Sequence, residues 1–279
     1  MTSEMKNLRN TSSDGGGSLR HEAVSFVGSL RRYCGVMLAL LRLEEEDRRR
    51  APLNSVLNLL EPVVLIGFTV VARWVLDRLH LAAVGGNPVL FYATGYFANY
   101  LYIYTSRAMR SVDRPQKRFP IESRLDHILI HIIVSVLDYI VLGIVGFGIL
   151  LVFVTAQALP YDFVPIVQAF LATVMLGFGM GVLNLVISKA LPLWRYIFPV
   201  LNRVSVLLSG VMYIPDFLSP NMREVLSYNP MLHAIALFRT GFYPNYPTLL
   251  LDTNYLFHCA CVAVIIGLVL ERVTRRAET

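Results

Sequence analysis

The sequence predicts an all-helical integral membrane protein with six transmembrane helices. Of its 279 residues, 55% are hydrophobic and only 16% are charged, whereas soluble domains carry about 25% charged residues. The mean hydropathy of +0.56 leaves too little polar surface to coat a water-soluble globule. Long apolar runs recur along the whole chain, which excludes a disordered protein and a secreted protein with a single signal peptide.

Two polar segments precede the apolar runs. Residues 1–23 are rich in Ser, Gly, Asn and charged residues, a composition typical of a flexible tail, which we expect in the cytoplasm. Residues 24–51 combine apolar and arginine side chains at a helical spacing. This pattern indicates an amphipathic helix in the membrane interface or, alternatively, one packed on a soluble partner. Near its end, Glu44 and Arg48 have the i,i+4 spacing that stabilises a helix in water.

Residues 52–276 form the predicted transmembrane domain. It contains six runs with few or no charged residues, each close to the roughly 20 residues that cross the hydrocarbon core. In the fourth run, Gly177 and Gly181 form a GxxxG motif, which lets another helix approach closely. The spans are expected at about residues 59–76, 87–106, 126–154, 163–188, 194–215 and 254–271.

The segment between the fifth and sixth spans has a different character. Residues 212–247 carry five prolines and apolar stretches that are too short to cross a bilayer. We expect them to form re-entrant or interfacial helices at the outer end of the domain.

Basic residues predict the orientation of the spans. With the N-terminus in the cytoplasm, twenty Lys and Arg residues fall in cytoplasmic segments and only Arg78, Arg223 and Arg239 fall outside. Positively charged loops favour the cytoplasmic side. The sequence therefore predicts a multi-pass protein with both termini inside.

Four charged residues lie at the ends of the predicted spans or within them. Glu61 and Arg73 fall near the two ends of the first span, Asp138 lies in the third and Arg203 in the fifth. A charge inside a membrane usually faces a bundle interior or water, so these residues are candidates for a role in transport. The alternative is structural ion pairing or snorkelling to the interface, especially for Glu61 and Arg73.

The second span carries a stripe of tyrosines, Tyr92, Tyr96, Tyr100 and Tyr104, with Phe97 beside it. Four-residue spacing places the tyrosines on one helix face over about 18 Å. Interfacial tyrosines gather at span ends, whereas this stripe crosses the middle. Flat rings with hydroxyls suit stacking on sugars, so the stripe predicts a substrate path. Aromatic packing between helices is the equal alternative.

The sequence predicts no metal site and no nucleotide site in this chain. Cys34, Cys259 and Cys261 lack a paired CxxC spacing, and His127 and His131 lack a third ligand. None of the three lysines lies in a GxxxxGK[ST] motif. If transport is driven by ATP, another polypeptide must therefore bind the ATP and Mg. We expect no nucleic-acid partner.

Several motifs resemble a known family. The chain contains SGVMY at 209–213 and YNPMLHAIALFR at 228–239, which resemble the signature region of ABC-2-type exporter permeases, in the branch that exports capsular polysaccharide or O-antigen. RAMR at 107–110 and KRFP at 117–120 resemble the cytoplasmic loop of that family, and LEP at 60–62 resembles its first-helix entry. The resemblance covers roughly residues 37 to 276.

The resemblance implies a six-helix type V exporter fold in the bacterial inner membrane. It implies a homodimeric permease with two copies of an ABC ATP-binding subunit, a polysaccharide path between the two permease chains, and periplasmic and outer-membrane export proteins beyond them. The chain would supply the path and no catalytic residues. The N-terminal helix and the loop after the second span would contact the ATPase, through Glu44, Arg48, Arg107, Arg110, Arg114, Lys117 and Arg118.

Three alternatives remain open from the sequence. The same fold exports other cargoes, such as a lipid, a teichoic-acid-like polymer or a drug. A membrane-embedded acyl- or glycosyltransferase would need clustered carboxylates or a histidine site at a membrane face, whereas Asp138 is alone in mid-span. A membrane scaffold without transport activity would need neither the intramembrane charges nor the tyrosine stripe.

Overall fold

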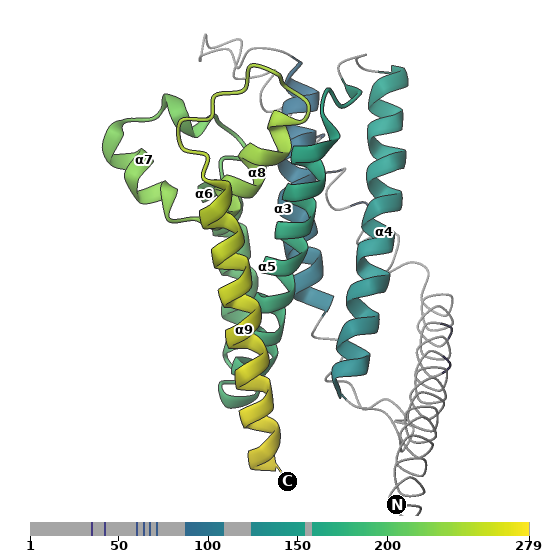
Figure 1. The fold of residues 1–279 in the computed structure, drawn as a ribbon, viewed down its shortest axis with the longest axis vertical. Coiled ribbons are helices and arrows are strands. Elements are labelled where there is room, and N and C mark those ends of the chain that lie inside the picture. The colour runs from purple at the N-terminus through teal and green to yellow at the C-terminus, as the bar shows by residue number, and fades with distance from the viewer. Residues whose placement is uncertain are drawn as a thin grey trace, which may run out of the picture. The chain divides into compact units, whose positions relative to one another are not determined.

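The computed structural model describes residues 87–108, 124–153 and 158–278, together with the single positions Gly35, Arg42, Leu60, Val64, Gly67 and Val71. All the regular secondary structure in these ranges is helical (Figure 1). The helices are α3 Pro88–Ala108, α4 Arg124–Phe153, α5 Phe163–Ala190, α6 Trp194–Leu208, η3 Pro215–Phe217 (a 3-10 turn), α7 Pro220–Ser227, α8 Pro230–Thr240 and α9 Thr253–Glu278.

Short polar residues fix where three of these helices begin. The side chain of Asp162 accepts a hydrogen bond from the backbone of Val164 at 2.8 Å, and so caps α5. Asn87 and Asn229 cap α3 and α8 in the same way, and each is followed by a proline in the first helical position. Such residues satisfy backbone N–H groups that have no partner inside the helix.

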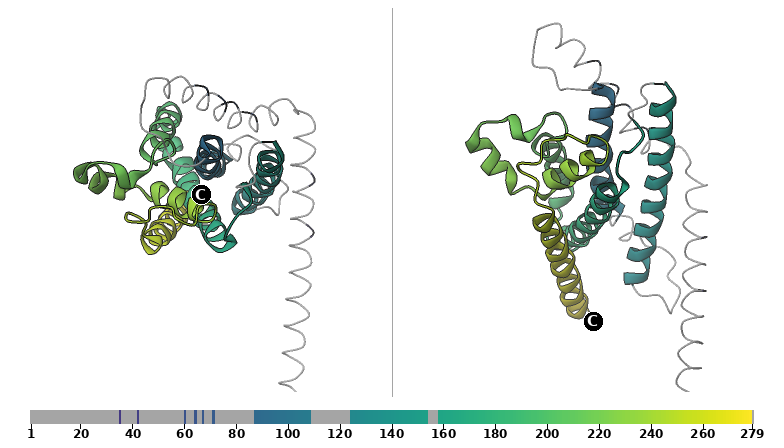
Figure 2. Two further views of the ribbon diagram at one scale, coloured as in Figure 1. Left: turned by 90° about the horizontal axis from the view of Figure 1, so that it is seen from above. Right: turned by 45° about the horizontal axis from the view of Figure 1, so that its top comes forward.

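The long helix α5 lies at the centre of the described bundle, where it packs against α3, α8 and α9. α3, α5 and α9 all begin at the end of the bundle that holds α7 and α8 (Figures 1 and 2). α4 runs in the opposite direction beside α3, because Tyr104 meets Tyr139 while Phe97, seven residues earlier, meets Phe147 further along α4.

Glycines permit the close helix packing around α5. A Cβ atom on Gly177 would overlap the Thr105 hydroxyl of α3, and one on Gly179 would overlap the backbone of Ala263 in α9. The expected close approach at the glycines of this span is confirmed, and it involves two different partners on opposite sides.

α6 is shorter than the span expected over residues 194–215. It ends at Leu208 after 15 residues, and Gly210 then adopts a positive φ of 73°. Only glycine takes this conformation without a steric penalty, so the chain leaves the helix there. Val211, which is apolar and fully buried, lies in irregular backbone beyond the turn.

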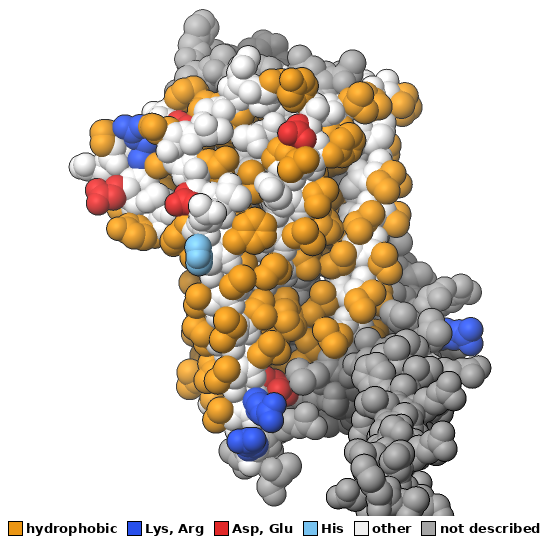
Figure 3. Space-filling view, viewed as in Figure 1, with side chains coloured by type: hydrophobic (Ala, Val, Ile, Leu, Met, Phe, Trp, Pro, Cys, Tyr) orange, Lys and Arg blue, Asp and Glu red, His pale blue; other side chains and the backbone are white. Residues whose placement is uncertain are grey.

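Three described helical segments are long and apolar enough to cross a membrane, namely Ile128–Phe153, Phe163–Ala190 and Thr253–Thr274. α3 has 21 residues but carries many Tyr, Asn, Thr and Ser side chains, and it is not among the three. Apolar side chains cover the long helices, and the charged side chains in view gather toward the two ends (Figure 3). The first predicted span and the 1–23 and 24–51 segments lie outside the described residues, apart from the single positions above. The depth of α7 and α8 in the membrane stays a prediction.

Candidate functional site

The guanidinium group of Arg239, in the last turn of α8, is completely buried. Its Nη1 donates to the Gly210 carbonyl at 2.8 Å, and its Nη2 donates to the Val211 carbonyl at 2.7 Å and the Phe91 carbonyl at 3.1 Å. Tyr246 accepts a further, longer hydrogen bond at 3.3 Å. One side chain therefore joins α8 to the backbone after α6 and to the first turn of α3.

No carboxylate among the described residues neutralises Arg239. Its charge is balanced by the carbonyl oxygens of Gly210 and Val211, just beyond the C-terminal end of α6 where the helix dipole is negative, and by the Phe91 carbonyl of α3. The Phe91 ring adds a cation–π contact, with its centroid 3.6 Å from Cζ of Arg239. Burial lowers the pKa of Arg239, and the neighbouring Tyr246 opposes that shift. A guanidinium group is not deprotonated in proteins, so these contacts hold a buried cation.

His233 makes the second connection from α8. The backbone N–H of Asp252 donates to Nδ1 of His233 at 3.1 Å, so the ring proton lies on Nε2 and is donated to the Ser227 carbonyl at 2.7 Å. Tyr255 packs edge-on against the imidazole at 5.2 Å and donates its hydroxyl proton to the Tyr228 carbonyl at 2.9 Å. These contacts tie α7 and α8 to the start of α9.

Asn229 makes the third connection. Its side-chain oxygen caps α8, and its Nδ2 donates to the Leu208 carbonyl at 3.2 Å, at the end of α6. We call Asn229, His233 and Arg239 the α8 anchor. The anchor joins the segment of α7 and α8 to α3, α6 and α9 by polar contacts, of which those of Arg239 are buried. This arrangement is suited to transmitting movement, and its three residues include no nucleophile–base pair. No group of three or more His, Cys, Asp or Glu residues within the described ranges could hold a metal ion.

The tyrosine stripe of α3 faces the interior of the bundle. Tyr96 is fully buried, Tyr92 and Tyr100 are 6% and 7% exposed, and Tyr104 is half-buried. The rings of Tyr96 and Tyr100 lie 6.1 Å apart. Phe97 and Tyr104 both meet Tyr139 of α4, and Phe97 also stacks on Phe238 of α8 at 5.4 Å. These positions within one chain favour the packing alternative for the tyrosines, and the substrate path along them stays a prediction.

The structure does not bring the charged candidates together in one site. Arg203 is exposed on α6 and makes no hydrogen bond or ion pair in the part of the chain that is described. Asp138 is half-buried on α4 and has an interaction partner, and Arg107 ends α3 with a partner of its own. The remaining candidates, Glu44, Arg48, Glu61, Arg73, Arg110, Arg114, Lys117 and Arg118, lie outside the described residues.

In the sequence, Asn229, His233 and Arg239 stand out only as parts of a motif, and no pattern around them predicts a role in the site. One signal was available, since Arg239 ends an apolar run and such a charge needs buried partners. Gly95, which lies beside Arg239, carried no such signal, because glycine is common in membrane helices.

Comparisons with known proteins agree with this architecture. The model of the ABC-2 type transporter family matches residues 37–243, about three quarters of the chain. Two curated relatives, both named polysialic acid transport protein KpsM and both from Escherichia coli, are 26% identical over 165 residues, which cover 59% of this chain. The match spans 61% of the length of those relatives. Because the family model covers most of the chain, including α3 to α8, this protein belongs to the ABC-2 type transporter family of membrane proteins.

Proposed function

We propose that this chain is the permease subunit of an ATP-driven exporter that moves a cell-surface polysaccharide across the bacterial inner membrane. Family membership supports a transport role, and the name of the two relatives, polysialic acid transport protein, supports an anionic glycan as the cargo class. At 26% identity the chemistry of the polymer does not follow. Capsule, O-antigen and exopolysaccharide are the candidates.

The exposed position of Arg203 on α6 is the observation that carries the proposal. Around it, Val200, Val204 and Leu207 are also exposed, so the guanidinium lies on an apolar helix surface. An arginine side chain that faces lipid in the middle of a membrane helix raises the free energy of insertion by about 2.5–3.5 kcal/mol. We infer that this α6 surface meets water or a second permease chain in the assembled transporter. A cationic side chain on a hydrated path between two chains would attract an anionic polymer without holding one sugar tightly.

Energy would come from a separate ABC ATP-binding subunit, because the sequence has no GxxxxGK[ST] motif. We propose a two-plus-two assembly with ATP and Mg on that subunit and both termini of the permease in the cytoplasm. Arg107, at the end of α3, begins the proposed contact surface. Arg110, Arg114, Lys117 and Arg118 of the following loop continue it, together with Glu44 and Arg48 of the amphipathic segment. Periplasmic and outer-membrane proteins would receive the polymer.

Arg203→Gln tests the path. We expect surface polysaccharide to fall at least several-fold in cells that carry this variant, with glycan accumulating inside, while the protein level and the co-purifying ATPase stay unchanged. Arg272→Gln, at an exposed position on α9, is the matched control and should export normally. Normal export by Arg203→Gln would show that Arg203 does not lie on the substrate path. Absence of any co-purifying P-loop ATPase would contradict the proposal that the chain belongs to an ATP-driven exporter.

The alternative is the same permease with another cargo, such as a lipid, a teichoic-acid-like polymer or a drug. The tyrosine stripe does not distinguish a polysaccharide from another cargo, because Tyr92, Tyr96 and Tyr100 are buried inside one chain. Cells lacking this chain decide between them: retained intracellular glycan supports polysaccharide export, whereas normal surface glycan with a changed outer-leaflet lipid composition supports the alternative.

A further inference from the structure

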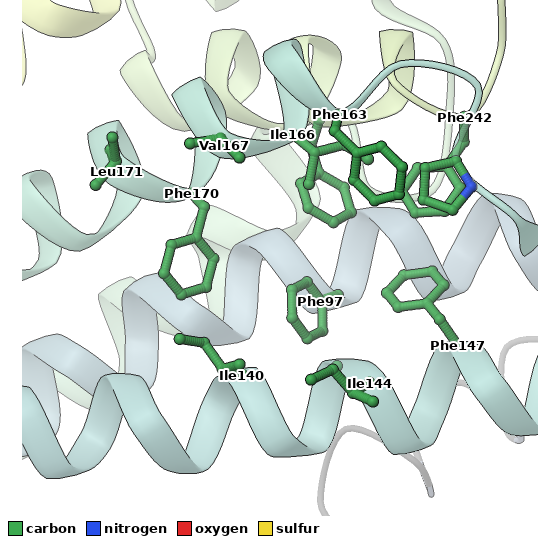
Figure 4. Close-up of a pocket in the computed structure, with 13 residues that line it drawn as sticks. Phe97, Ile140, Ile144, Phe147, Phe163, Ile166, Val167, Phe170, Leu171 and Phe242 are labelled. Carbon is green, nitrogen blue, oxygen red and sulfur yellow. The ribbon is translucent and has the colours of Figure 1, made fainter.

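An open groove of about 430 Å³ lies between α4 and α5. Its thirteen lining residues are all Phe, Ile, Leu, Val, Pro or Gly. Ile140, Ile144 and Phe147 form the α4 wall, and Phe163, Val167 and Phe170 form the α5 wall (Figure 4). None of these side chains offers a hydrogen-bonding group, so the groove has no means of orienting a polar ligand.

Aromatic rings keep the floor of the groove in place. Phe97 stacks on Phe238 and meets Phe147, with both centroid distances at 5.4 Å, and Phe147 stacks on Phe242 at 4.9 Å. A Cβ atom on Gly143 would come within 2.8 Å of the Phe97 ring, so this glycine lets the ring lie against the α4 backbone. Rings from α3, α4 and the α8 region support one another, and the groove is therefore pre-formed.

The surroundings of the groove favour a hydrocarbon chain as its occupant. α4 and α5 are both apolar enough to span a membrane, and Ile144, Val167 and Leu171 at the groove are 70%, 53% and 53% exposed. Water would need polar partners, which the lining lacks. An apolar cavity of about 150 Å³ holds a benzene ring, so a groove nearly three times larger accommodates a long acyl chain.

The charges beside the groove distinguish between lipid headgroups. Asp162 is exposed and directly precedes Phe163, and its position is fixed by its own backbone N–H, which donates to the Gly241 carbonyl at 3.1 Å. No Lys or Arg occurs between residues 125 and 188. An exposed carboxylate at the end of the groove attracts an ammonium group and repels an anionic headgroup.

We propose that this groove binds one acyl chain of a bilayer phospholipid whose ammonium headgroup, as in phosphatidylethanolamine, lies beside Asp162. The site is separate from the α6 surface that carries the proposed function. Its ligand is a resident membrane lipid, which would hold α4 to the rest of the bundle.

Fluorescence quenching in nanodiscs tests the acyl chain. The full-length protein, with Trp74→Phe and Trp194→Phe, receives one reporter: Phe170→Trp in the groove, or Val164→Trp on the same helix. Val164 is 61% exposed and does not line the groove, so it is the matched control. We expect phosphatidylethanolamine with brominated acyl chains to half-quench the groove reporter at a mole fraction about tenfold lower than the control reporter. Brominated phosphatidylglycerol should quench both alike.

Filling the groove provides a second, independent measurement. Native mass spectrometry should find one retained phosphatidylethanolamine per chain in the wild type and in Val164→Trp, and none in Val167→Trp. Asp162→Asn keeps the helix cap but should remove the preference for phosphatidylethanolamine over phosphatidylglycerol. Equal quenching at residues 164 and 170 by brominated phosphatidylethanolamine, or a lipid retained by Val167→Trp, would overturn the proposal. A cross-link from Val167→Cys to another segment or to a second copy of this chain would also overturn the proposal, because protein would then cover the groove.

Discussion

Gly95 of α3 leaves the space that the guanidinium of Arg239 occupies. A Cβ atom on Gly95 would lie 2.6 Å from Nη2 of Arg239 and 3.1 Å from the Val211 carbonyl oxygen. Residues far apart in the sequence are thus fitted to one another around a single buried charge. The start of α3, the turn after α6 and the end of α8 are therefore expected to move as one body.

The first prediction follows from this contact. Gly95→Ala should destabilise the protein by about 1–3 kcal/mol, since one methyl group overpacks the site. Arg239→Met should destabilise it further, because each carbonyl left without a donor costs about 1–3 kcal/mol. Thermal unfolding in detergent measures both, with Arg272→Met on the exposed face of α9 as control. The double variant should lose less stability than the sum of the losses in the two single variants, since both substitutions disrupt the same contact. Additive losses would separate Gly95 from the arginine.

The positions of the helices could be read from the sequence where local signals define them. The expected spans at 87–106 and 163–188 begin and end within two residues of α3 and α5, because Asn87 and Asp162 cap the starts. The end of α6 was not readable in the same way. Val211 and Met212 continue the apolar run, but the carbonyls of Gly210 and Val211 bind Arg239, which lies 29 and 28 residues further along the chain.

The second prediction concerns His233. His233→Gln can still place a donor near the Ser227 carbonyl, and His233→Asn can still place an acceptor near the Asp252 N–H, so each should keep one of the two hydrogen bonds. We expect each to destabilise the protein by about 1–3 kcal/mol, and His233→Ala to exceed both. Hydrogen exchange should show faster opening at the start of α9. Unchanged exchange there in His233→Ala would contradict the link between α8 and α9.

The third prediction uses the glycines of α5. Gly179→Ala should lower the unfolding temperature strongly, because its methyl group would overlap the backbone of Ala263 and Val264, which cannot rotate away. Gly148→Ala in α4 is the control, since nothing lies within 4 Å of that position. There, alanine should be neutral or stabilising by about 0.5–1 kcal/mol, because it favours the helix. Equal effects at both positions would show that α5 and α9 are not in close contact.

The fourth prediction separates packing from path at the tyrosine stripe. Replacing Tyr96 and Tyr100 by Leu together removes two buried rings that lie 6.1 Å apart. If the rings pack the bundle, thermal stability should fall by several kcal/mol, as for other aromatic truncations in a core, and polysaccharide export should fall with it. Tyr104→Leu, at a half-buried position, should have the smaller effect on stability. Loss of export at unchanged stability in the double variant would place the tyrosines on the substrate path.

The candidate site shows the limit of sequence reasoning more clearly than the fold does. A periodic stripe such as Tyr92 to Tyr104 reveals which residues share a helix face, but not whether that face meets substrate or another helix. Here the neighbours are supplied by α4 and α8, which are distant in sequence: Tyr104 and Phe97 meet Tyr139 of α4, and Phe97 stacks on Phe238 of α8. Three of the four hydrogen-bond acceptors of Arg239 are backbone carbonyls, which every residue carries, so no side-chain pattern could identify them.

The fifth prediction concerns orientation in the membrane. In Figure 1, α7 lies at the opposite end of the described bundle from the C-terminus, so their reactivities toward an outside reagent should differ. In a chain with Cys34, Cys259 and Cys261 replaced by Ser, a cysteine at exposed Asn221 of α7 should react with a membrane-impermeant thiol reagent in intact cells. Cysteines at Gly16 and Thr279 should not react, because the excess of basic residues predicts that both termini lie in the cytoplasm.

Permeabilised cells provide the control for this labelling, since all three cysteines should react once the membrane is breached. The contrast between Asn221 and Thr279 depends on the fold, because an odd number of crossings must separate two ends of the bundle. The protection of Gly16 depends on the first predicted span, which lies outside the described residues. Labelling of Gly16 with protection of Thr279 would leave α7 to α9 as described but require five crossings in place of six. Labelling of Thr279 with protection of Asn221 would invert the orientation that the basic residues predict.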